Sequence, residues 1–177
     1  MMQYRVNRET GNTAASADIL EHPFGPLYSE RSRVLILGSF PSVKSREQNF
    51  FYGHPQNRFW RVIAAVTGQP VPETISEKRE LILSQTLALW DSIASCEITG
   101  SSDASIRNVK VNDLSVIFDN CDIRRICCNG KKSYELYQKY IEKQTGREAI
   151  CLPSTSPANA QWTLPKLIEA WGVILEK

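Results

Sequence analysis

The sequence predicts an α/β protein, a three-layer α/β/α sandwich built on a four-stranded, mainly parallel sheet. The first supporting observation is a set of short, nearly continuous apolar runs bounded by Gly, Pro or Ser, typical of strands buried on both faces. The second is that helical patterns lie between these runs, an alternation that favours a parallel sheet. The length of 177 residues suits one domain with its own hydrophobic core.

The expected strands are the apolar runs at 33–39 (RVLILGS), 86–93 (TLALWDSI), 124–130 (RRICCNG) and 148–154 (EAICLPS). In open parallel sheets a ligand binds beyond the carboxyl ends of the strands. We therefore expect the functional site in the loops that begin at Gly38, Ser92, Asn129 and Ser154.

The expected helices are the segments NRFWRVIAAVTG, SEKRELILSQ, NDLSVIFDN, SYELYQKYIEKQTG and LPKLIEAWGVIL. Gly68 and Gly146 end two of them and are natural C-terminal caps, while Ser76 is expected to cap the second segment at its N-terminus. Residues 1–20 have little apolar periodicity and are interpreted as a flexible lead-in, so the single domain spans 21–177.

Composition excludes several classes of protein. A formal charge of +2 does not mark a nucleic-acid binder, so any such function must rest on a local patch. The five cysteines have no spacing that completes a metal site, and we expect reduced thiols and no bound metal. No secretory signal or apolar run of membrane-spanning length occurs, which predicts a cytoplasmic protein that does not contact membranes.

The loop after the first strand, GSFPSVKSREQNFFYGHPQNRFW, holds more functional groups than a turn needs. Gly38 can let the backbone approach a ligand closely, and the ring of Tyr52 can stack on a planar group. Asn57 begins a helix. The alternative is an ordinary connection in which Phe59 and Trp60 are core residues and Asn57 is only a cap.

Two further loops carry groups that suit a phosphate. The segment CLPSTSPANA (151–160) is rich in hydroxyls and stiffened by prolines, although an ordinary Ser/Pro turn explains it equally well. In NGKKS (129–133), Gly130 and the helix start could receive a phosphate beside Lys131 and Lys132, but the glycine spacing of a P-loop is missing.

The segment 91–106 supplies Asp91, Glu97 and Asp103 in what is expected to be a loop, and any of these carboxylates could act as a base. No Gly-x-Ser-x-Gly elbow occurs, and neither histidine has a partner that the sequence identifies. A serine-hydrolase function is therefore disfavoured.

Several of these motifs together resemble the uracil-DNA glycosylase superfamily, and within it the hypoxanthine-DNA glycosylase-like branch. From about Val34 to the C-terminus the matching motifs are GSFPS, YGHPQNRFW, LWDSIASCEITGSSDASI, NGKKS and LPSTSPAN. The resemblance implies a four-stranded parallel sheet and cleavage of the N-glycosidic bond of a damaged base without a cofactor. It also implies double-stranded DNA with a deaminated base as the partner, and we expect a monomer.

Carried over by position, the resemblance implies a role for each matching residue. Catalysis falls to Asn57 and Ser154; the base-binding residues are Gly38, Ser39, Phe40, Tyr52, His54 and Asp103; the DNA-binding residues are Lys131, Ser156, Ala158 and Asn159. We assign Asn57 to orient water through its amide oxygen.

The chain departs from the family pattern at three positions. Phe40 stands where several branches carry the Asp or Asn that activates water, so the usual catalytic residue is missing. Ser154 replaces a His or Asn, and Ala158 replaces a bulky wedge that fills the gap in the duplex. How the leaving base is stabilised is left open by these replacements.

Two other functions stay open at this point. A hydrolase could act on a small ester or nucleotide through Ser39 or Ser156 with His54. A non-catalytic module could instead bind damaged DNA on the same scaffold. The sequence leaves the preferred base open among hypoxanthine, uracil and xanthine, because these bases differ only in exocyclic groups and pairing.

Overall fold

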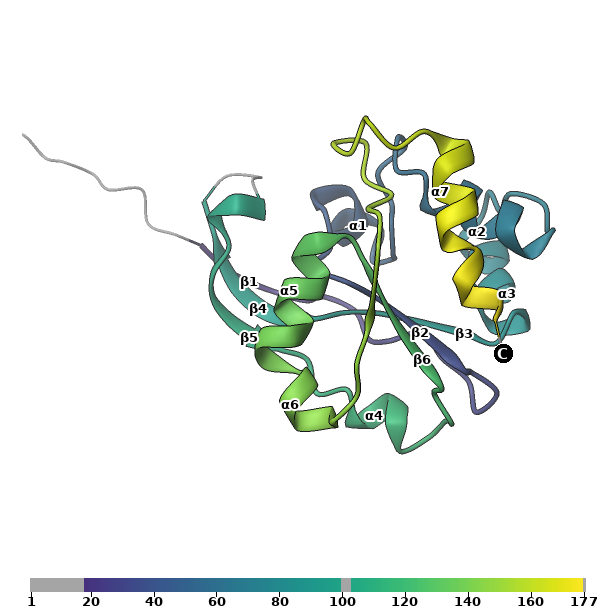
Figure 1. Ribbon diagram of the computed structural model, residues 1–177. Coiled ribbons are helices and arrows are strands. Elements are labelled where there is room, and N and C mark those ends of the chain that lie inside the picture. Colours follow the sequence, from purple (N-terminus) through teal and green to yellow (C-terminus); the bar gives the residue numbers. More distant parts are fainter. Residues whose placement is uncertain (1–17, 100–102, 177) are drawn as a thin grey trace, which may run out of the picture.

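The computed structural model describes residues 18–99 and 103–176, which form a four-stranded and a three-stranded sheet with helices around them (Figure 1). The strand order of the larger sheet is β3-β2-β6-β7, and every neighbouring pair is parallel. Its strands are β2 (Val34–Gly38), β3 (Leu87–Asp91), β6 (Arg125–Asn129) and β7 (Ile150–Leu152). The predicted four-stranded parallel sheet is therefore confirmed.

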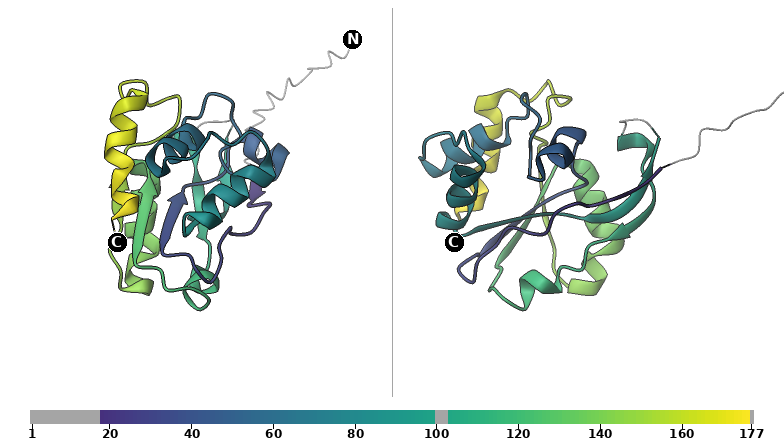
Figure 2. Two further views of the ribbon diagram at one scale, coloured as in Figure 1. Left: turned by 90° about the vertical axis from the view of Figure 1, so that its right-hand side faces the viewer. Right: turned by 180° about the vertical axis from the view of Figure 1, so that it is seen from behind.

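The core lies on both faces of this sheet because most residues of its strands are apolar. Every residue of β2 and of β3 is buried. Helices α2 (Phe59–Thr67), α3 (Ile75–Ser84) and α7 (Leu164–Trp171) cover one face, while α5 (Lys131–Tyr140) and α6 (Glu142–Thr145) lie on the other side (Figures 1 and 2). This arrangement is the predicted three-layer sandwich.

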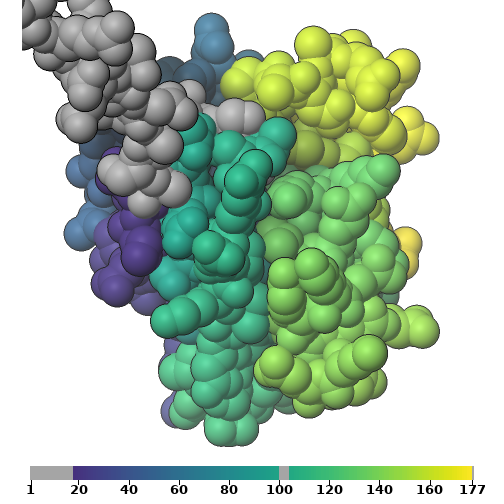
Figure 3. All heavy atoms as spheres, turned by 90° about the vertical axis from the view of Figure 1, so that its left-hand side faces the viewer, coloured from purple at the N-terminus to yellow at the C-terminus, as the bar shows by residue number. Residues whose placement is uncertain are grey.

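The second sheet was not predicted. It is antiparallel, in the order β1-β4-β5, and consists of β1 (Asp18–Glu21), β4 (Ile93–Ile98) and β5 (Arg107–Val111). Its strands are only half-buried and rich in polar residues, which is why β4 was expected to be a loop. Figure 3 shows these strands, in purple and teal, beside the green α5 and α6.

The second sheet also changes the expected start of the domain. Residues 18–20, which were assigned to the lead-in, pair with β4 as part of β1. The rest of that segment, residues 1–17, lies outside the described part of the chain. Only Ser92 separates β3 from β4, so the chain passes directly from one sheet to the other.

The helix ends show which capping predictions were correct. Gly68 and Gly146 follow α2 and α6 with φ values of 67° and 64°, as expected for glycine caps. The prediction that Ser76 caps α3 was wrong. Thr74 is the cap, because it forms a reciprocal capping box with Glu77.

The remaining elements are short. Helix α1 (Val43–Gln48) lies within the loop after β2 and was not predicted, whereas α4 (Ser115–Phe118) falls in an expected segment. The 3-10 turns are η1 (Asp103–Ser105) and η2 (Gly172–Leu175), the latter continuing α7. No helix in residues 18–99 or 103–176 is long and apolar enough to cross a membrane.

Candidate active site

A cavity of about 220 Å³ opens at the carboxyl ends of the parallel strands, where the sequence places the site. It is smaller than the roughly 300 Å³ at which pockets for drug-sized ligands begin. Most of the predicted site residues line it: Gly38, Ser39, Phe40, Tyr52, His54, Asn57, Ser154 and Ser156.

The other predicted residues lie elsewhere. Lys131, Ala158 and Asn159 line an open surface hollow that adjoins the cavity and shares Ser154 and Ser156 with it. The backbone of Asp103 belongs to η1, and its side chain lies outside the described part of the chain. Three of the four residues expected to touch DNA are therefore beside the cavity and not in it.

Asn57 is held firmly at the wall of the cavity. Its Oδ1 accepts a hydrogen bond from the Phe59 amide at 2.9 Å and another from the Thr155 hydroxyl at 2.9 Å. An amide oxygen has two lone pairs, so both are occupied. No described residue accepts from the Nδ2 group, which leaves its N–H bonds available to a ligand.

Asn129 and Thr155 extend this network. The Asn129 amide donates to Thr155 Oγ1 at 3.0 Å and accepts from the Thr155 backbone N–H at 3.0 Å. Thr155 is fully buried. Because Thr155 Oγ1 accepts from Asn129 and donates to Asn57, the direction of its hydroxyl hydrogen and the orientation of both amides are fixed.

Arg58 ties the last loop to the start of α2. Its guanidinium donates to the carbonyl oxygens of Ser156 at 2.8 Å and Asn159 at 3.1 Å, and also to that of Trp162. Its backbone N–H donates to Thr155 at 3.1 Å. The planar fork of an arginine suits such multiple contacts, and it gives the proline-rich loop a defined conformation.

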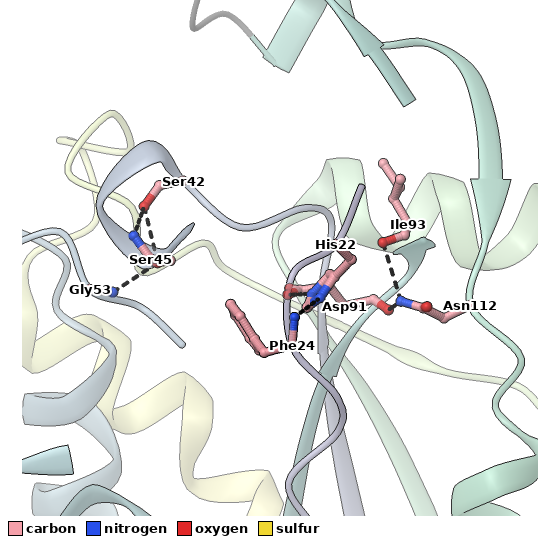
Figure 4. A network of polar contacts seen from close by, with 8 residues as sticks. All are labelled: His22, Phe24, Ser42, Ser45, Gly53, Asp91, Ile93 and Asn112. Carbon is pink, nitrogen blue, oxygen red and sulfur yellow. Dashed lines mark hydrogen bonds and ion pairs between the residues drawn. The ribbon is translucent and has the colours of Figure 1, made fainter. Parts of the chain in front are cut away.

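Asp91 ends β3 and lines the cavity while only 5% exposed. His22, which follows β1, donates from Nε2 to Asp91 Oδ2 at 2.7 Å, and Asn112 holds the backbone carbonyl of Asp91 at 2.9 Å (Figure 4). A Cβ on Gly38 would lie 2.2 Å from Asp91 Oδ1, so only glycine admits the carboxylate there. Asp91 is therefore enclosed on several sides.

Tyr52 lies at the same end of the cavity. Its φ of 50° is left-handed, and one face of its ring stacks on Phe59 with centroids 3.8 Å apart. Its hydroxyl is buried without a regular hydrogen bond among the described residues. Burial, followed by the charge of Asp91, raises the pKa of the phenol far above its usual value, and the Asn129 amide offsets this a little. Tyr52 is therefore neutral.

Helix α1 fixes the turn that carries Tyr52. The Ser45 hydroxyl accepts from the Gly53 amide at 2.9 Å and contacts the Ser42 hydroxyl at 3.1 Å (Figure 4). Arg46 lies over the ring of Phe40, with its guanidinium carbon 5.9 Å from the ring centroid. Phe40 thus closes one wall of the cavity by packing.

No described serine forms a catalytic pair with a histidine. His54 accepts from the Gln56 amide through Nδ1, and neither Ser39 nor Ser156 is hydrogen-bonded to it among the described residues. Within the same residues no group of His, Cys, Asp and Glu side chains is arranged to hold a metal ion. The geometry gives the Ser/His hydrolase hypothesis no support.

Four residues that shape this site were not predicted from the sequence to have a role in it: His22, Arg58, Asn129 and Thr155. Asn129 and Thr155 were noted only as parts of motifs, and Arg58 looked like an ordinary helical residue. Asp91 was named as a possible base without a partner. His22 is 69 residues from Asp91, and no local pattern links them.

Comparison with known proteins identifies the family of this chain. The family model described as "Uracil DNA glycosylase superfamily" matches residues 26–174. A protein named hypoxanthine DNA glycosylase from Methanosarcina acetivorans is 32% identical over 147 residues, 82% of this chain and 92% of that protein. One of the same name from Methanosarcina barkeri is 32% identical over 138 residues, 77% of this chain and 86% of that protein.

A solved structure agrees with these matches. It is a solution NMR structure from Methanosarcina acetivorans, provisionally described as a uracil DNA glycosylase. It aligns with a TM-score of 0.76 and 30% sequence identity, over 89% of this chain and 98% of the other. The motifs, the sheet and the matched length agree, and the chain belongs to the uracil DNA glycosylase superfamily.

Proposed function

We propose that this DNA glycosylase removes hypoxanthine from double-stranded DNA by hydrolysing its N-glycosidic bond, as the first step of base excision repair. Uracil and xanthine are further candidate bases. The names of the two relatives support hypoxanthine. The observation that carries the proposal is the small polar cavity at the strand ends, with Asn57 fixed in its wall.

A base inside a duplex does not reach such a cavity, so the nucleotide must first rotate out of the helix. Flipping costs a few kcal/mol, and less for a mispaired base. Deaminated bases pair poorly and therefore enter more readily than normal ones. The cavity of about 220 Å³ excludes larger ligands but suits a single planar base.

Bond cleavage passes through a sugar with oxocarbenium character, while negative charge grows on the departing base. Asn57 is the group we assign to the attacking water. Because Oδ1 already accepts two hydrogen bonds, the water binds to the Nδ2 amide, which differs from the role expected from the sequence. A neutral amide does not act as a strong base, so its contribution is positioning.

The last loop offers donors to DNA phosphates. Ser154 Oγ accepts from the Ser156 amide at 3.2 Å, and Ser156 Oγ accepts from the Ala158 amide at 3.3 Å. Neither hydroxyl donates to another described residue, so both hydrogens are available to a phosphate. Lys131, whose side chain is 85% exposed, lies at the adjoining hollow and adds positive charge.

At the position where the resemblance places a bulky wedge, the loop carries Ala158. Ala158 is exposed but small, and we assign no wedge to it. Asn159 donates to the Ser154 carbonyl at 3.0 Å, so it supports the loop from within. The protein is proposed to act as a monomer on one flipped nucleotide, with no cofactor.

The test is base release from duplexes that contain one hypoxanthine, uracil or xanthine, with undamaged DNA as control. Wild type is compared with Asn57→Ala and with Asn120→Ala, an exposed asparagine that does not line the cavity. We expect Asn57→Ala to lower release by about 100- to 1000-fold while lesion binding persists. Asn120→Ala should behave as wild type.

Two outcomes would contradict the proposal. Release that survives in Asn57→Ala would remove this residue from the mechanism. Binding of damaged DNA without release from any duplex would favour the non-catalytic module instead.

A further inference from the structure

Arg46 is an unpaired cation beside the cavity, and the mechanism above does not use it. The residue is half-buried, its Nε is buried without a hydrogen-bond partner, and no described carboxylate forms an ion pair with it. The acidic residue of α1, Glu47, is paired with Lys44 at 2.9 Å instead. A buried donor left unpaired is costly, so a guanidinium kept in this state needs an explanation.

The Arg46 guanidinium is held by packing and not by an opposite charge. Its carbon lies 5.9 Å from the centroid of the Phe40 ring, a contact in which the aromatic face attracts the cation. Phe40 lines the cavity, as do Ser42 and Ser45, whereas Arg46 does not. Arg46 therefore lies at the rim, outside the space that takes the base, and its charge is available there.

Ser42 supplies a second donor one helical turn before Arg46. The Arg46 amide donates to the Ser42 carbonyl at 2.9 Å. Ser45, which is 2% exposed, accepts from the Gly53 amide at 2.9 Å through Oγ, and this atom lies 3.1 Å from Ser42 Oγ. The buried Ser45 hydroxyl therefore donates its own hydrogen to Ser42. The hydroxyl hydrogen of the exposed Ser42 is then left for a ligand.

Arg46 and Ser42 together present hydrogen-bond donors and one positive charge to the rim. A guanidinium binds phosphate through two parallel hydrogen bonds, and a hydroxyl can donate to a further oxygen. Rotating a nucleotide out of a duplex carries the phosphates on both sides of its sugar toward the mouth of the cavity. The ligand that fits this rim is therefore a phosphodiester group of DNA and not the base.

The rim at Arg46 is separate from the phosphate donors of the last loop. Arg46 and Ser42 follow β2, whereas Ser154 and Ser156 follow β7, and β6 lies between these two strands in the sheet. Figure 1 shows α1 and the yellow last loop above the same ends of the strands. Donors at two places on the rim can hold the DNA backbone on both sides of one flipped nucleotide.

We propose that Arg46, assisted by the Ser42 hydroxyl, binds a DNA phosphate next to the flipped nucleotide. The inference rests on the proposed function, because a flipped nucleotide brings this phosphate to the rim. The contact forms only after the rotation, so it favours the flipped state over the stacked one. It also supplies the local positive charge that a chain with a formal charge of only +2 needs for binding DNA.

The experiment measures binding of a duplex with one hypoxanthine nucleotide that carries fluorine at the sugar 2′ position. Fluorine destabilises the oxocarbenium-like sugar, so the base stays attached during the measurement. Salt is varied from about 50 to 200 mM, because the slope of log K against log salt reports how many phosphates are neutralised. In four further duplexes, one of the four phosphates nearest the lesion is replaced by an uncharged methylphosphonate.

The variants are Arg46→Gln, Arg46→Lys and Ser42→Ala. Arg79→Gln is the matched control, because Arg79 is an exposed arginine of α3 that does not line the cavity. Urea unfolding of each variant identifies any that do not fold. Base release from the same duplex without fluorine is measured in parallel.

We expect Arg46→Gln to weaken binding about 10- to 100-fold and to lower the salt slope by about one. Arg46→Lys keeps the charge and the slope but loses the paired hydrogen bonds, and it binds about 3- to 10-fold less tightly than wild type. Ser42→Ala weakens binding about 3- to 10-fold without changing the slope, because a hydroxyl carries no charge. Arg79→Gln binds as wild type does.

The methylphosphonates locate the contact. One of the four substitutions should weaken binding by wild type about as much as Arg46→Gln does, and it should have no further effect in that variant. A purely structural role of Arg46 in supporting Phe40 would instead weaken binding of all four duplexes by the same factor as that of the unmodified one.

The inference is overturned if Arg46→Gln folds and keeps the wild-type salt slope, or if it combines additively with every methylphosphonate. If Arg46→Gln does not fold, Arg46→Lys decides, and binding as tight as that of wild type would overturn the inference. Failure of the proposed function is seen separately, because it would appear as wild type that binds the duplex and releases no base.

Discussion

The wall and the floor of the cavity are built from different kinds of interaction. The wall, formed by Asn57, Thr155 and Asn129, is a chain of neutral amides and one hydroxyl. The floor holds the ionisable contact between His22 and Asp91. Neutral groups fix geometry without a large desolvation cost, whereas a buried carboxylate offers a strong acceptor and needs a partner. The wall thus offers fixed neutral groups, whereas the floor offers a carboxylate acceptor.

The largest effect is expected at the floor. Replacing Gly38 by Ala would put a Cβ 2.2 Å from Asp91 Oδ1 and force the carboxylate to move. Release of hypoxanthine should fall by about 100-fold or more, with a stability loss of about 1–3 kcal/mol from overpacking. Single-turnover release and urea unfolding measure the two effects. Gly25→Ala is the control, because nothing lies near its added Cβ. Normal release by Gly38→Ala would show that Asp91 can shift freely.

The next effect concerns the support of the wall. Arg58→Lys keeps the charge but loses the fork that binds the carbonyls of Ser156, Asn159 and Trp162. We expect a loss of about 2–4 kcal/mol in the free energy of unfolding and a drop in release of about 10- to 100-fold. Arg61→Lys, on the exposed side of α2, is the matched control. Equal behaviour of the two variants would refute the role of Arg58.

A smaller effect is expected within the wall itself. Thr155→Val has nearly the same shape but removes the hydroxyl that joins Asn129 to Asn57. It should cost about 1–3 kcal/mol of stability because two half-buried amides lose a partner, and it should slow release about tenfold. Thr155→Ser retains the hydroxyl and should restore most of the activity. If Val and Ser variants release base at the same rate, the hydroxyl is not needed.

The smallest effect contrasts the polar floor with the apolar interior of the parallel sheet. Burial raises the pKa of the Cys127 and Cys128 thiols to about 12. Unfolded thiols lose their protons near pH 9, so as pH rises from 9 to 12 the unfolded state is favoured and stability falls. Below pH 9 both states keep the protons and the effect disappears.

Urea unfolding at pH 8 and pH 10.5 measures this loss. Cys128→Val should lose less stability between the two pH values than wild type does. Cys151 is exposed, so Cys151→Ala should lose almost as much stability as wild type. An identical pH dependence for Cys128→Val and wild type would contradict the assignment.

The sequence predicted the parallel sheet because its strands are continuous apolar runs, and that pattern needs no knowledge of neighbours. It missed β1, β4 and β5 because half-buried polar strands such as IASCEI lack a clear period and depend on their pairing partners. Sequence alone also placed the start of α3 wrongly, since Thr74 and Ser76 are both good caps and only the contact with Glu77 decides between them.

The residues of the site also divide into those that a local motif predicted and those that only the folded structure brings together. Tyr52, His54 and Asn57 lie in one compact motif, and they were predicted to belong to the site from that motif and its resemblance to a family. The contact between His22 and Asp91 joins residues 69 positions apart, and the links from Arg58 span about a hundred. Contacts of that length arise only from the folded topology. Their roles in recognition and catalysis stay predictions until the variants are measured.

The position of His22 has a practical consequence for the design of truncated versions of the protein. A truncated version that starts at residue 26, where the match to the family model begins, would retain the whole parallel sheet and the cavity-lining residues from Gly38 onward. It would nevertheless lose β1 and the only imidazole that contacts Asp91 among the described residues. The stretch that the family model matches therefore does not contain every residue that contacts the lining of the cavity.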